Sequence, residues 1–244
     1  IDKLNLKYPR VKCVLNKKNV GMGAGNNIGI KMSDTRFVMI MNPDTKLKNN
    51  TLDEIINVTK DLEFAVAAPM INNKNNLNYK TTVKDKEIKN YNKHFIEVDQ
   101  VDGFCMIIDK HKFQGNYFDE NFFMYLENDD FCKRLSQYNQ NIFIIPKSRI
   151  KHLGAKAVSD EYAYEVELSR NWHWIWSKFY FNKKHFGFPY ALLNGLPVFL
   201  SAITKVLFYF FINKKKKQIY LQRCRGYLNA LFGKKSFYRP KINF

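Results

Sequence analysis

One short stretch organises the rest of the chain: Phe37-Val38-Met39-Ile40-Met41-Asn42-Pro43-Asp44-Thr45. Five apolar residues in a row, bounded by charge before and by Asn-Pro-Asp after, predict a strand buried on both faces, as in parallel α/β sheets. Pro43 cannot continue a strand, so the chain turns there and presents Asp44 at the sheet's carboxyl edge, where ligands bind. A carboxylate in that place suits a hard cation such as Mg²⁺ or Mn²⁺. A plain exit from strand to turn would use the same residues.

The composition divides the chain into two parts. The 244 residues carry a net charge of +18, yet residues 171–244 hold 14 Lys or Arg and no Asp or Glu. We therefore expect a near-neutral α/β domain over residues 1–158 and a helical, aromatic and basic region over residues 159–244. The four cysteines lack C-x-x-C spacing, which predicts buried free thiols: Cys13, Cys105, Cys132 and Cys224.

Further apolar runs outline an α/β domain. They predict strands over residues 11–15, 64–69, 101–109 and 141–146, a helix over residues 52–62 and a short helical turn over residues 110–113. The polar stretch from residue 72 to residue 100 predicts a long surface excursion with an edge hairpin. It is interpreted either as a functional loop or as an insertion without a role in chemistry.

A glycine-rich run follows the first of these strands: Asn19-Val20-Gly21-Met22-Gly23-Ala24-Gly25-Asn26-Asn27-Ile28-Gly29. Glycines at alternate positions before a helical pattern indicate a tight turn whose backbone N–H groups can approach a phosphate or a sugar hydroxyl. The run lacks the Gly-Lys-Ser/Thr of a Walker A loop, and Asn26 replaces the third glycine of a dinucleotide fingerprint. A purely structural start of a helix remains the alternative.

Residues 118–130 are dense in acidic and aromatic side chains. A helix that starts near Asn128 places Glu127 at its positive end, and Asp130 can pair with Arg134 four residues later. Aromatic neighbours can raise the pKa of a carboxyl enough for it to serve as a general base, whereas the alternative is an acid-rich helix cap. His152 follows a predicted strand and is either structural or in contact with a metal or a diphosphate.

The basic tail predicts membrane association. Ser159 predicts the start of a helix that runs towards residue 182, with three tryptophans in its second half. Residues 198–212 are apolar but too short for a bilayer span of about 20 residues, which favours an interfacial or re-entrant helix. Lys214-Lys215-Lys216-Lys217 would then contact an anionic leaflet. A solvated charge run is the alternative, and nucleic-acid binding is disfavoured because the basic residues flank an apolar stretch.

Taken in order, the motifs resemble one enzyme family. They are Asn-x-Gly-x-Gly-x-x-Asn-Asn-x-Gly (19–29), Asn-Pro-Asp (42–44), Gly-x-Cys-Met (103–106), Phe-Asp-Glu-x-Phe-Phe-x-Tyr-x-Glu-x-x-Asp (118–130) and His-x-Gly (152–154). The combination resembles the family 2 inverting glycosyltransferases, and most closely their rhamnosyltransferase-like branch, over roughly residues 11–182. The resemblance implies a GT-A fold with a mixed, mainly parallel sheet, a dTDP- or UDP-sugar donor and a divalent cation, Mg²⁺ or Mn²⁺.

The resemblance also implies roles for particular residues. Asp44 and His152 would bind the metal, and Glu127 would be the catalytic base, with Asp129 or Asp130 as alternatives because Asn128 stands where relatives carry Asp. The donor site would be formed by Asn19, Gly21, Gly23, Asn26, Asn27, Asn42, Asp44, Gly103 and Phe104.

Relatives open with a strand, a turn and a helix that hold the nucleotide base, and we expect this chain to lack that N-terminal unit. The predicted function is transfer of a sugar, rhamnose in the nearest branch, to a glycan or lipid-linked acceptor in cell-surface polysaccharide synthesis. The predicted location is the cytoplasmic face of a bacterial-type plasma membrane. The alternatives are a fragment or a catalytically inactive membrane-associated scaffold, and no nucleic-acid partner is expected.

Overall fold

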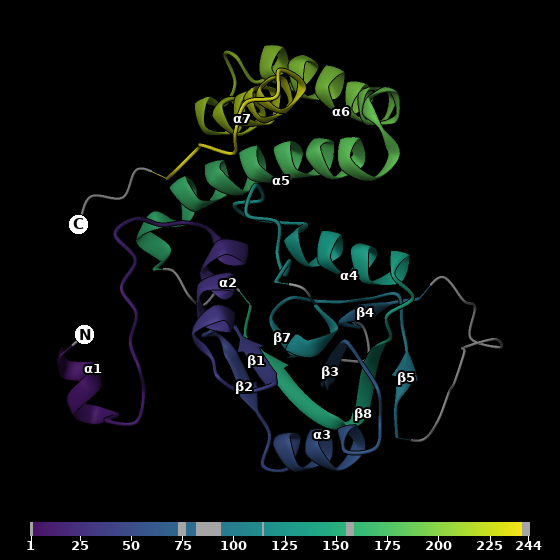
Figure 1. The fold of residues 1–244 in the computed structure, drawn as a ribbon. Coiled ribbons are helices and arrows are strands. Elements are labelled where there is room, and N and C mark those ends of the chain that lie inside the picture. The colour runs from purple at the N-terminus through teal and green to yellow at the C-terminus, as the bar shows by residue number, and fades with distance from the viewer. Residues whose placement is uncertain (1, 73–76, 82–93, 114, 155–158, 241–244) are drawn as a thin grey trace.

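The computed structural model describes residues 2–72, 77–81, 94–113, 115–154 and 159–240. It shows an α/β body beneath a layer of three helices (Figure 1). The body contains α1 (Asp2–Lys7), α2 (Met22–Met32), β1 (Phe37–Met41), β2 (Thr45–Leu47), α3 (Thr51–Thr59), β3 (Val66–Ile71), β4 (Tyr79–Lys80), β5 (Ile96–Glu97), β6 (Gln100–Val101), β7 (Cys105–Asp109), the 3₁₀ turn η1 (Lys110–Lys112), α4 (Glu127–Gln137) and β8 (Ile142–His152). The layer contains the 3₁₀ turn η2 (Asp160–Tyr162), α5 (Ala163–Phe186), α6 (Phe188–Phe208) and α7 (Lys214–Leu231).

The main sheet is mixed, as predicted. Its strand order is β1-β7-β3-β8-β2, with β5 on β8, and β4 and β6 form a separate pair. The expected predominance of parallel pairs is not found in the described strands, since β3 and β8 are parallel while β7 runs against β1 and β3 and β8 runs against β2 and β5. The long strand β8 explains much of this, because it accepts β5 near one end and β2 near the other.

Strand β1 has the predicted bounds but lies at the sheet's edge. Among the described strands it pairs with β7 only, and the side chains of Phe37 and Met41 are 43% and 46% exposed. The prediction that β1 is buried on both faces is therefore wrong. Five apolar residues are sufficient to indicate a strand, but its depth in the sheet depends on partner strands that its own residues do not specify.

The strand predicted over residues 11–15 is not formed. This segment is irregular, and the side chains of Val11, Val14 and Leu15 are between 50% and 79% exposed. A β-strand requires a hydrogen-bonding neighbour, and no strand in the described parts of the chain pairs with this segment. The strand propensity of the run is therefore not realised.

The polar excursion is only partly described, because residues 73–76 and 82–93 lie outside the described residues. The described part supplies β4 and β5. In place of the predicted edge hairpin, β4 pairs with β6 apart from the main sheet, and the intervening β5 pairs with β8. Three of the four cysteines are buried and all four are free thiols, while Cys13 is partly exposed.

Apolar side chains cover both faces of the main sheet. On one face, Ile30 of α2 and Phe131 of α4 join the core residues of β3 and β7. On the other face, Ile55 of α3 packs with Phe143 and Ile145 of β8. Helices α2, α3 and α4 are thereby fixed on the sheet, and the first turns of α2 and α4 meet near the end of β1.

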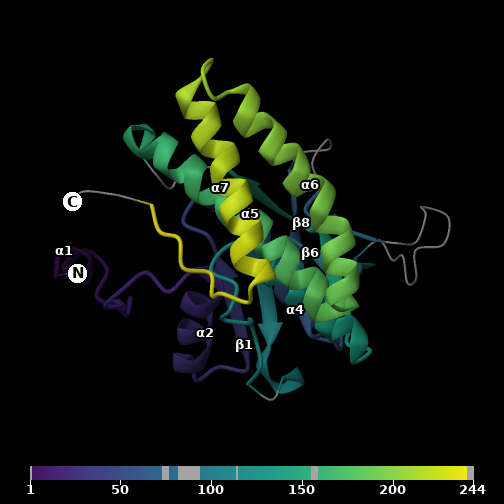
Figure 2. The same cartoon turned by 90° about the horizontal axis from the view of Figure 1, so that it is seen from above.

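The helical layer is centred on α5, which lies over α4, while α6 and α7 lie side by side on top of α5 (Figures 1 and 2). Trp172 and Trp176 are buried in this layer, whereas Trp174 is 46% exposed. Glycines permit the close packing, because a Cβ at Gly226 would lie 2.4 Å from the Trp172 carbonyl oxygen. The aromatic residues of α5 thus contribute chiefly to packing.

Helix α6 begins earlier than the sequence predicts. It is continuous over 21 residues, with Pro189 in its first turn, where proline is tolerated, and with Pro197 inside. The expected 15-residue apolar helix over residues 198–212 is therefore wrong in its bounds. By length and composition α6 is long and apolar enough to cross a membrane, and only 11% of its most apolar window is buried.

Candidate active site

The two predicted metal ligands lie together at the edge of the sheet. Thr45, the first residue of β2, pairs with His152, the last residue of β8, so Asp44 lies beside that histidine. The His152 Nε2 atom is 3.2 Å from the Asp44 Oδ1 atom, and Asp44 is only 9% exposed. The His152 ring stacks on Phe104, with 4.3 Å between the ring centroids. Pairing of two strands has thus joined residues that lie 108 positions apart.

The donor set of this pair suits a divalent cation. A carboxylate oxygen and an imidazole nitrogen are both ligands that Mn²⁺ accepts, and Mg²⁺ commonly combines one or two carboxylates with substrate phosphates and water. Among the described residues, no group of three or more His, Cys, Asp or Glu side chains is placed to hold a metal ion. The residues present therefore fit a cation whose remaining ligands come from a bound diphosphate and water.

The loop from Gly103 to Phe104 connects this pair to the helix starts. The Phe104 carbonyl oxygen accepts hydrogen bonds from the Asn42 N–H at 2.8 Å and from the Thr45 hydroxyl at 3.3 Å. A Cβ at Gly103 would lie 3.2 Å from Asn128 Cβ and 3.2 Å from Met22 Cε. The loop thus contacts His152 of the Asp44–His152 pair on one side and the starts of α2 and α4 on the other.

Glu127 is the first residue of α4 and is only 3% exposed. Its Oε2 atom is buried without a hydrogen-bond partner. Burial, with a smaller contribution from the charge of Asp129, raises the pKa of the Glu127 carboxyl from 4.5 to about 7. A carboxyl with this pKa is part ionised at neutral pH and can accept a proton, as predicted for a general base.

The two alternative bases are already engaged. Asp130 is fully buried, and its oxygens contact Arg134 Nε at 2.9 Å, Lys184 Nζ at 2.7 Å and His185 Nε2 at 2.8 Å. The predicted Asp130–Arg134 pair is confirmed, but these partners make Asp130 an anchor between α4 and α5. Asp129 accepts a hydrogen bond from Gln100 Nε2 at 2.6 Å. The catalytic role predicted for Asp130 therefore does not fit its surroundings.

The glycine run forms the start of α2, as predicted. Gly21 has a φ of +94°, and a Cβ there would lie 2.4 Å from the Phe123 carbonyl oxygen. The Asn19 side chain accepts a hydrogen bond from the Gly21 N–H at 3.1 Å and so shapes the turn. A Cβ at Gly23 would lie 3.5 Å from Glu127 Cβ, which places the run directly against the predicted base.

The two asparagines of the run have different environments. The Asn26 Nδ2 atom is buried without a partner, which leaves an N–H donor available to a ligand. The Asn27 amide donates to the Phe118 carbonyl at 2.8 Å and to Glu120 at 2.9 Å, and it accepts from the Phe118 N–H at 3.0 Å. The donor-binding role of Asn27 stays a prediction, and in this structure its amide holds the 118–120 segment.

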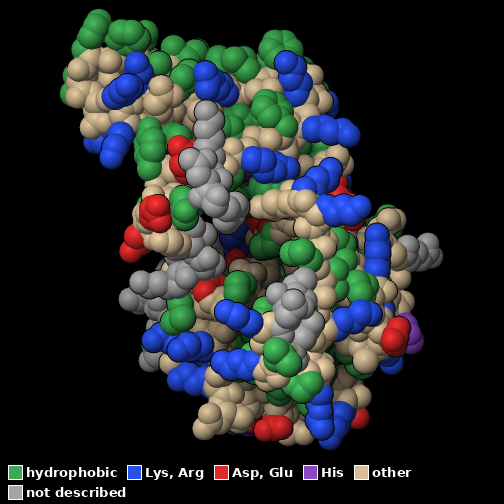
Figure 3. Space-filling model, turned by 90° about the vertical axis from the view of Figure 1, so that its left-hand side faces the viewer, with side chains coloured by type: hydrophobic (Ala, Val, Ile, Leu, Met, Phe, Trp, Pro, Cys, Tyr) green, Lys and Arg blue, Asp and Glu red, His purple; other side chains and the backbone are tan. Residues whose placement is uncertain are grey.

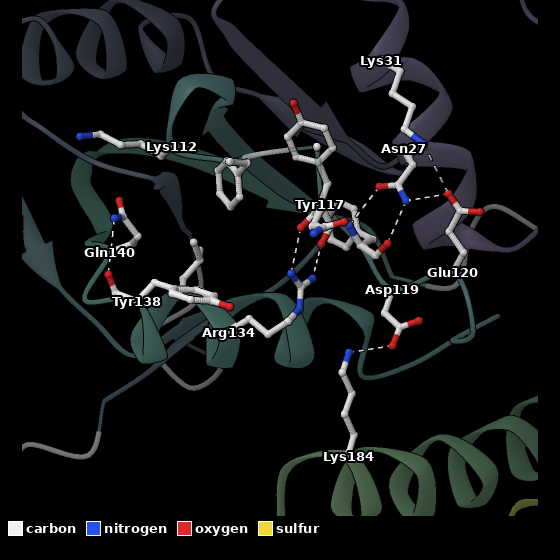
Figure 4. Close-up of a pocket in the computed structure, with 15 residues that line it drawn as sticks. Asn27, Lys31, Lys112, Tyr117, Asp119, Glu120, Arg134, Tyr138, Gln140 and Lys184 are labelled. Carbon is white, nitrogen blue, oxygen red and sulfur yellow. Dashed lines mark hydrogen bonds and ion pairs between the residues drawn. The ribbon is translucent and has the colours of Figure 1, made fainter. Parts of the chain in front are cut away.

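A separate cavity of about 790 Å³ lies between α2, the 112–120 segment and the C-terminal half of α4 (Figure 4). Arg134 donates to the carbonyls of Asn116 and Tyr117 on one wall, and Lys184 pairs with Asp119 at 2.7 Å on another. Asp44, His152 and Glu127 do not line this cavity. Its charged groups serve to join α4 and α5 to the 112–120 segment.

Sequence reasoning missed Asp102, which lies directly before Gly103. The pKa of the Asp102 carboxyl is raised overall, by burial and by the charge of Asp129, although the charges of Lys80 and His152 act to lower it. Asp102 is therefore close enough to the Asp44–His152 pair to interact with it electrostatically. Its position next to Gly103, in the Gly-x-Cys-Met motif, is the signal that marks it.

Comparisons with known proteins indicate similarity in sequence and in fold. Residues 1–116 match the family model described as Glycosyl transferase family 2. This segment is just under half of the chain, and over it the chain is similar to the family 2 glycosyltransferases. The low-salt glycan biosynthesis hexosyltransferase Agl10 of Haloferax volcanii is 29% identical over 140 residues, which cover 51% of this chain and 46% of Agl10. The chain thus spans about half the length of that relative.

A solved structure shows the same fold. The mannosyltransferase PcManGT of Pyrobaculum calidifontis, in complex with GDP-Man and Mn²⁺, matches 96% of this chain and 74% of its own chain, with a TM-score of 0.51 and 10% identity. The GT-A-type α/β fold is thereby confirmed. The chain is therefore similar to glycosyltransferases in sequence and in fold. The rhamnosyltransferase-like branch and the lack of an N-terminal unit stay predictions.

Proposed function

We propose that this protein is an inverting glycosyltransferase that moves a sugar from a nucleotide-diphosphate donor to a hydroxyl of a glycan or lipid-linked acceptor. One observation carries the proposal: His152, paired with Asp44, stacks on Phe104, while the adjoining Gly103 lies against Asn128, the residue after Glu127, whose buried Oε2 atom has no hydrogen-bond partner. A cation-binding pair next to a carboxylate with a pKa of about 7 provides both activation of a leaving group and removal of a proton.

The reaction is a single displacement. Glu127 accepts the proton of the acceptor hydroxyl, and the oxygen forms a bond to the anomeric carbon as the bond to the diphosphate breaks. The electron pair of that broken bond leaves with the diphosphate, and attack from the opposite face inverts the anomeric configuration. Asp44 and His152 would hold the cation, which would supply positive charge to neutralise the departing diphosphate. Asn26 Nδ2, at the start of α2, provides a donor for a phosphate or sugar oxygen.

The donor is proposed to be a dTDP- or UDP-hexose, with rhamnose as the sugar that the sequence motifs favour. Agl10 is named a hexosyltransferase, which supports a hexosyl group, and the PcManGT complex contains GDP-Man, so a guanine nucleotide is included in the test. The Mn²⁺ of that complex supports a divalent cation as the cofactor.

Calorimetric titration with dTDP, UDP and GDP, each with and without Mn²⁺, tests the donor site. We expect Mn²⁺-dependent binding of one nucleotide to the wild type and its loss in Asp44→Ala. Asp34→Ala is the matched control, because Asp34 is exposed and lies outside the site. Binding that is unchanged by Asp44→Ala, or absent for all three nucleotides, would overturn the proposal and favour the inactive scaffold or the fragment.

We also propose that the helical layer holds the enzyme at the cytoplasmic face of a membrane. Leu193, Leu200 and Leu207 of α6 are 52% to 71% exposed, and Phe211 in the following turn is 93% exposed. Four lysines, Lys214–Lys217, open α7 immediately afterwards. Figure 3 shows hydrophobic side chains along the end of the molecule that α6 and α7 occupy, with Lys and Arg side chains close by. Apolar side chains beside cations match lipid tails beside anionic headgroups.

Sedimentation with vesicles tests this placement. We expect binding to vesicles of phosphatidylcholine with phosphatidylglycerol, weaker binding to phosphatidylcholine alone, and loss of that preference when Lys214–Lys217 are replaced by glutamine. Each basic residue near an anionic surface contributes about 1 kcal/mol. Equal sedimentation of wild type and variant with both vesicles would contradict the proposal. Binding at the membrane would bring the site near a lipid-linked acceptor.

A further inference from the structure

The backbone directly before Glu127 has an unusual conformation. Tyr125 and Leu126 have φ values of +71° and +65°, in the left-handed region that non-glycine residues seldom adopt. A non-glycine residue in this conformation is strained and persists only where its surroundings enforce it. Leu126 is the N-cap of α4, so these two residues determine the direction in which Glu127, the first helical residue, points.

Helix α5 contacts this turn with three side chains that share one face of the helix. The hydroxyl of Ser177 donates to the Met124 carbonyl oxygen at 2.8 Å, and Ser177 is fully buried. Arg170 Nε donates to the Tyr125 hydroxyl at 3.2 Å, and the ring of Trp174 packs edge-on against Tyr125 with 5.5 Å between centroids. Positions 170, 174 and 177 follow the i, i+4, i+7 spacing of a helix face.

The start of α2 holds the same segment from the other side. The Met22 N–H donates to the Phe123 carbonyl oxygen at 3.1 Å, and Gly21 approaches that residue so closely that a Cβ would not fit. Residues 123–126 are therefore held between the predicted donor loop and α5. Two consecutive carbonyls of this segment have fixed partners, one from each element.

We propose that α5 is a positioning element for catalysis: Ser177, supported by Trp174 and Arg170, holds residues 125 and 126 in the left-handed conformation that keeps Glu127 buried. The inference rests on the proposed role of Glu127 as the base. Ser177 is a positioning residue, because it acts through the Met124 carbonyl and the turn. Loss of its hydroxyl leaves that carbonyl without its partner and allows the turn to relax, which moves Glu127 towards solvent.

The test measures the titration of Glu127 itself. Protein labelled with ¹³C at the glutamate carboxyl is titrated by NMR, and the Glu127 signal is identified by its loss in Glu127→Gln. We expect Ser177→Ala to lower the pKa of Glu127 from about 7 towards its ordinary value. The substitution does not alter the charge of Asp129, which also raises the pKa of Glu127, or the hydroxyl of Tyr125, whose own pKa is raised by the charge of Glu127.

Ser169→Ala is the matched control. Ser169 is also buried on α5, but its hydroxyl has no hydrogen-bond partner, so its removal should leave the titration of Glu127 unchanged. Trp174→Leu provides a second variant at an exposed position where the fold is not at risk, and we expect a smaller decrease of the same pKa. A Ser177→Ala protein that melts at a lower temperature but titrates as the wild type would show a merely structural role and overturn the inference.

The two proposals fail in different ways. The NMR titration requires no donor or acceptor, so an unchanged Glu127 pKa in Ser177→Ala and Trp174→Leu refutes the positioning role while metal-dependent nucleotide binding stands. Absence of nucleotide binding refutes the proposed function while the titration still reports how α5 acts on the turn.

Discussion

Replacing Glu127 by glutamine should make the protein more stable while it removes the proposed base. The carboxyl is 3% exposed, and burial raises its pKa to about 7 in the folded protein from an ordinary 4.5. Between these two values the folded state binds more protons than the unfolded chain, so the stability that the wild type has at low pH is lost as the pH rises through this window. Glutamine has nearly the same shape but no charge to bury.

The size of the effect follows from this difference in pKa. One pKa unit corresponds to about 1.4 kcal/mol, so a buried charge at Glu127 costs about 3 kcal/mol at pH 8, where the carboxyl is ionised in both states. At pH 5 the folded protein keeps the proton, and the cost is only about 1 kcal/mol. For a chain of this size 1 kcal/mol moves the melting temperature by roughly 2–4 °C. Glu127→Gln should therefore raise it by about 6–12 °C at pH 8 and by about 2–4 °C at pH 5.

Thermal unfolding of both proteins at the two pH values measures this difference. Comparing wild type with variant at each pH removes the contributions of all other titrating groups. Glu63→Gln is the control, because the Glu63 side chain is 90% exposed, and it should change the melting temperature little at either pH. An equal stabilisation by Glu127→Gln at pH 5 and at pH 8 would refute the reasoning. It would show that ionisation of the Glu127 carboxyl does not destabilise the folded protein.

Two further substitutions test the elements around the base. Asp130→Asn should lower the free energy of unfolding by about 3–5 kcal/mol, because it removes the buried anion that Arg134 and His185 contact. Chemical denaturation measures this free energy, and a decrease below about 1 kcal/mol would contradict the anchoring role of Asp130. Gly21→Ala should lower both the melting temperature and nucleotide affinity, since its Cβ would lie 2.4 Å from the Phe123 carbonyl oxygen, whereas Gly25→Ala, with nothing within 4 Å, should leave both unchanged or slightly improved.

The parts of the site that sequence predicted are those in which a short motif determines its own geometry. The Asn-Pro-Asp motif after an apolar run predicted Asp44 at a sheet edge, and the helix start predicted Glu127 at the N-terminus of a helix; the structure confirms both positions. Features that depend on partners were missed or misplaced. Three features depend on which segments lie beside them: the edge position of β1, the irregular segment 11–15 and the hydrogen bonds of Asn27 to residues 118–120. The residue pattern within each segment does not specify its neighbours in the fold.

The contrast between Glu127 and Asp130 shows how tertiary packing assigns roles to similar residues. Both are buried acids in the first turn of α4, and sequence alone left both as candidates for the base. Asp130 faces α5, where Lys184 and His185 join Arg134 around its oxygens, so its charge is compensated and its lone pairs are occupied. Glu127 faces the glycine run, where Gly23 leaves space and one oxygen stays without a partner. A carboxylate that is already compensated serves to join helices, whereas an uncompensated one is available to take a proton. Two of the three partners of Asp130, Lys184 and His185, lie on α5, more than 50 positions downstream of either acid.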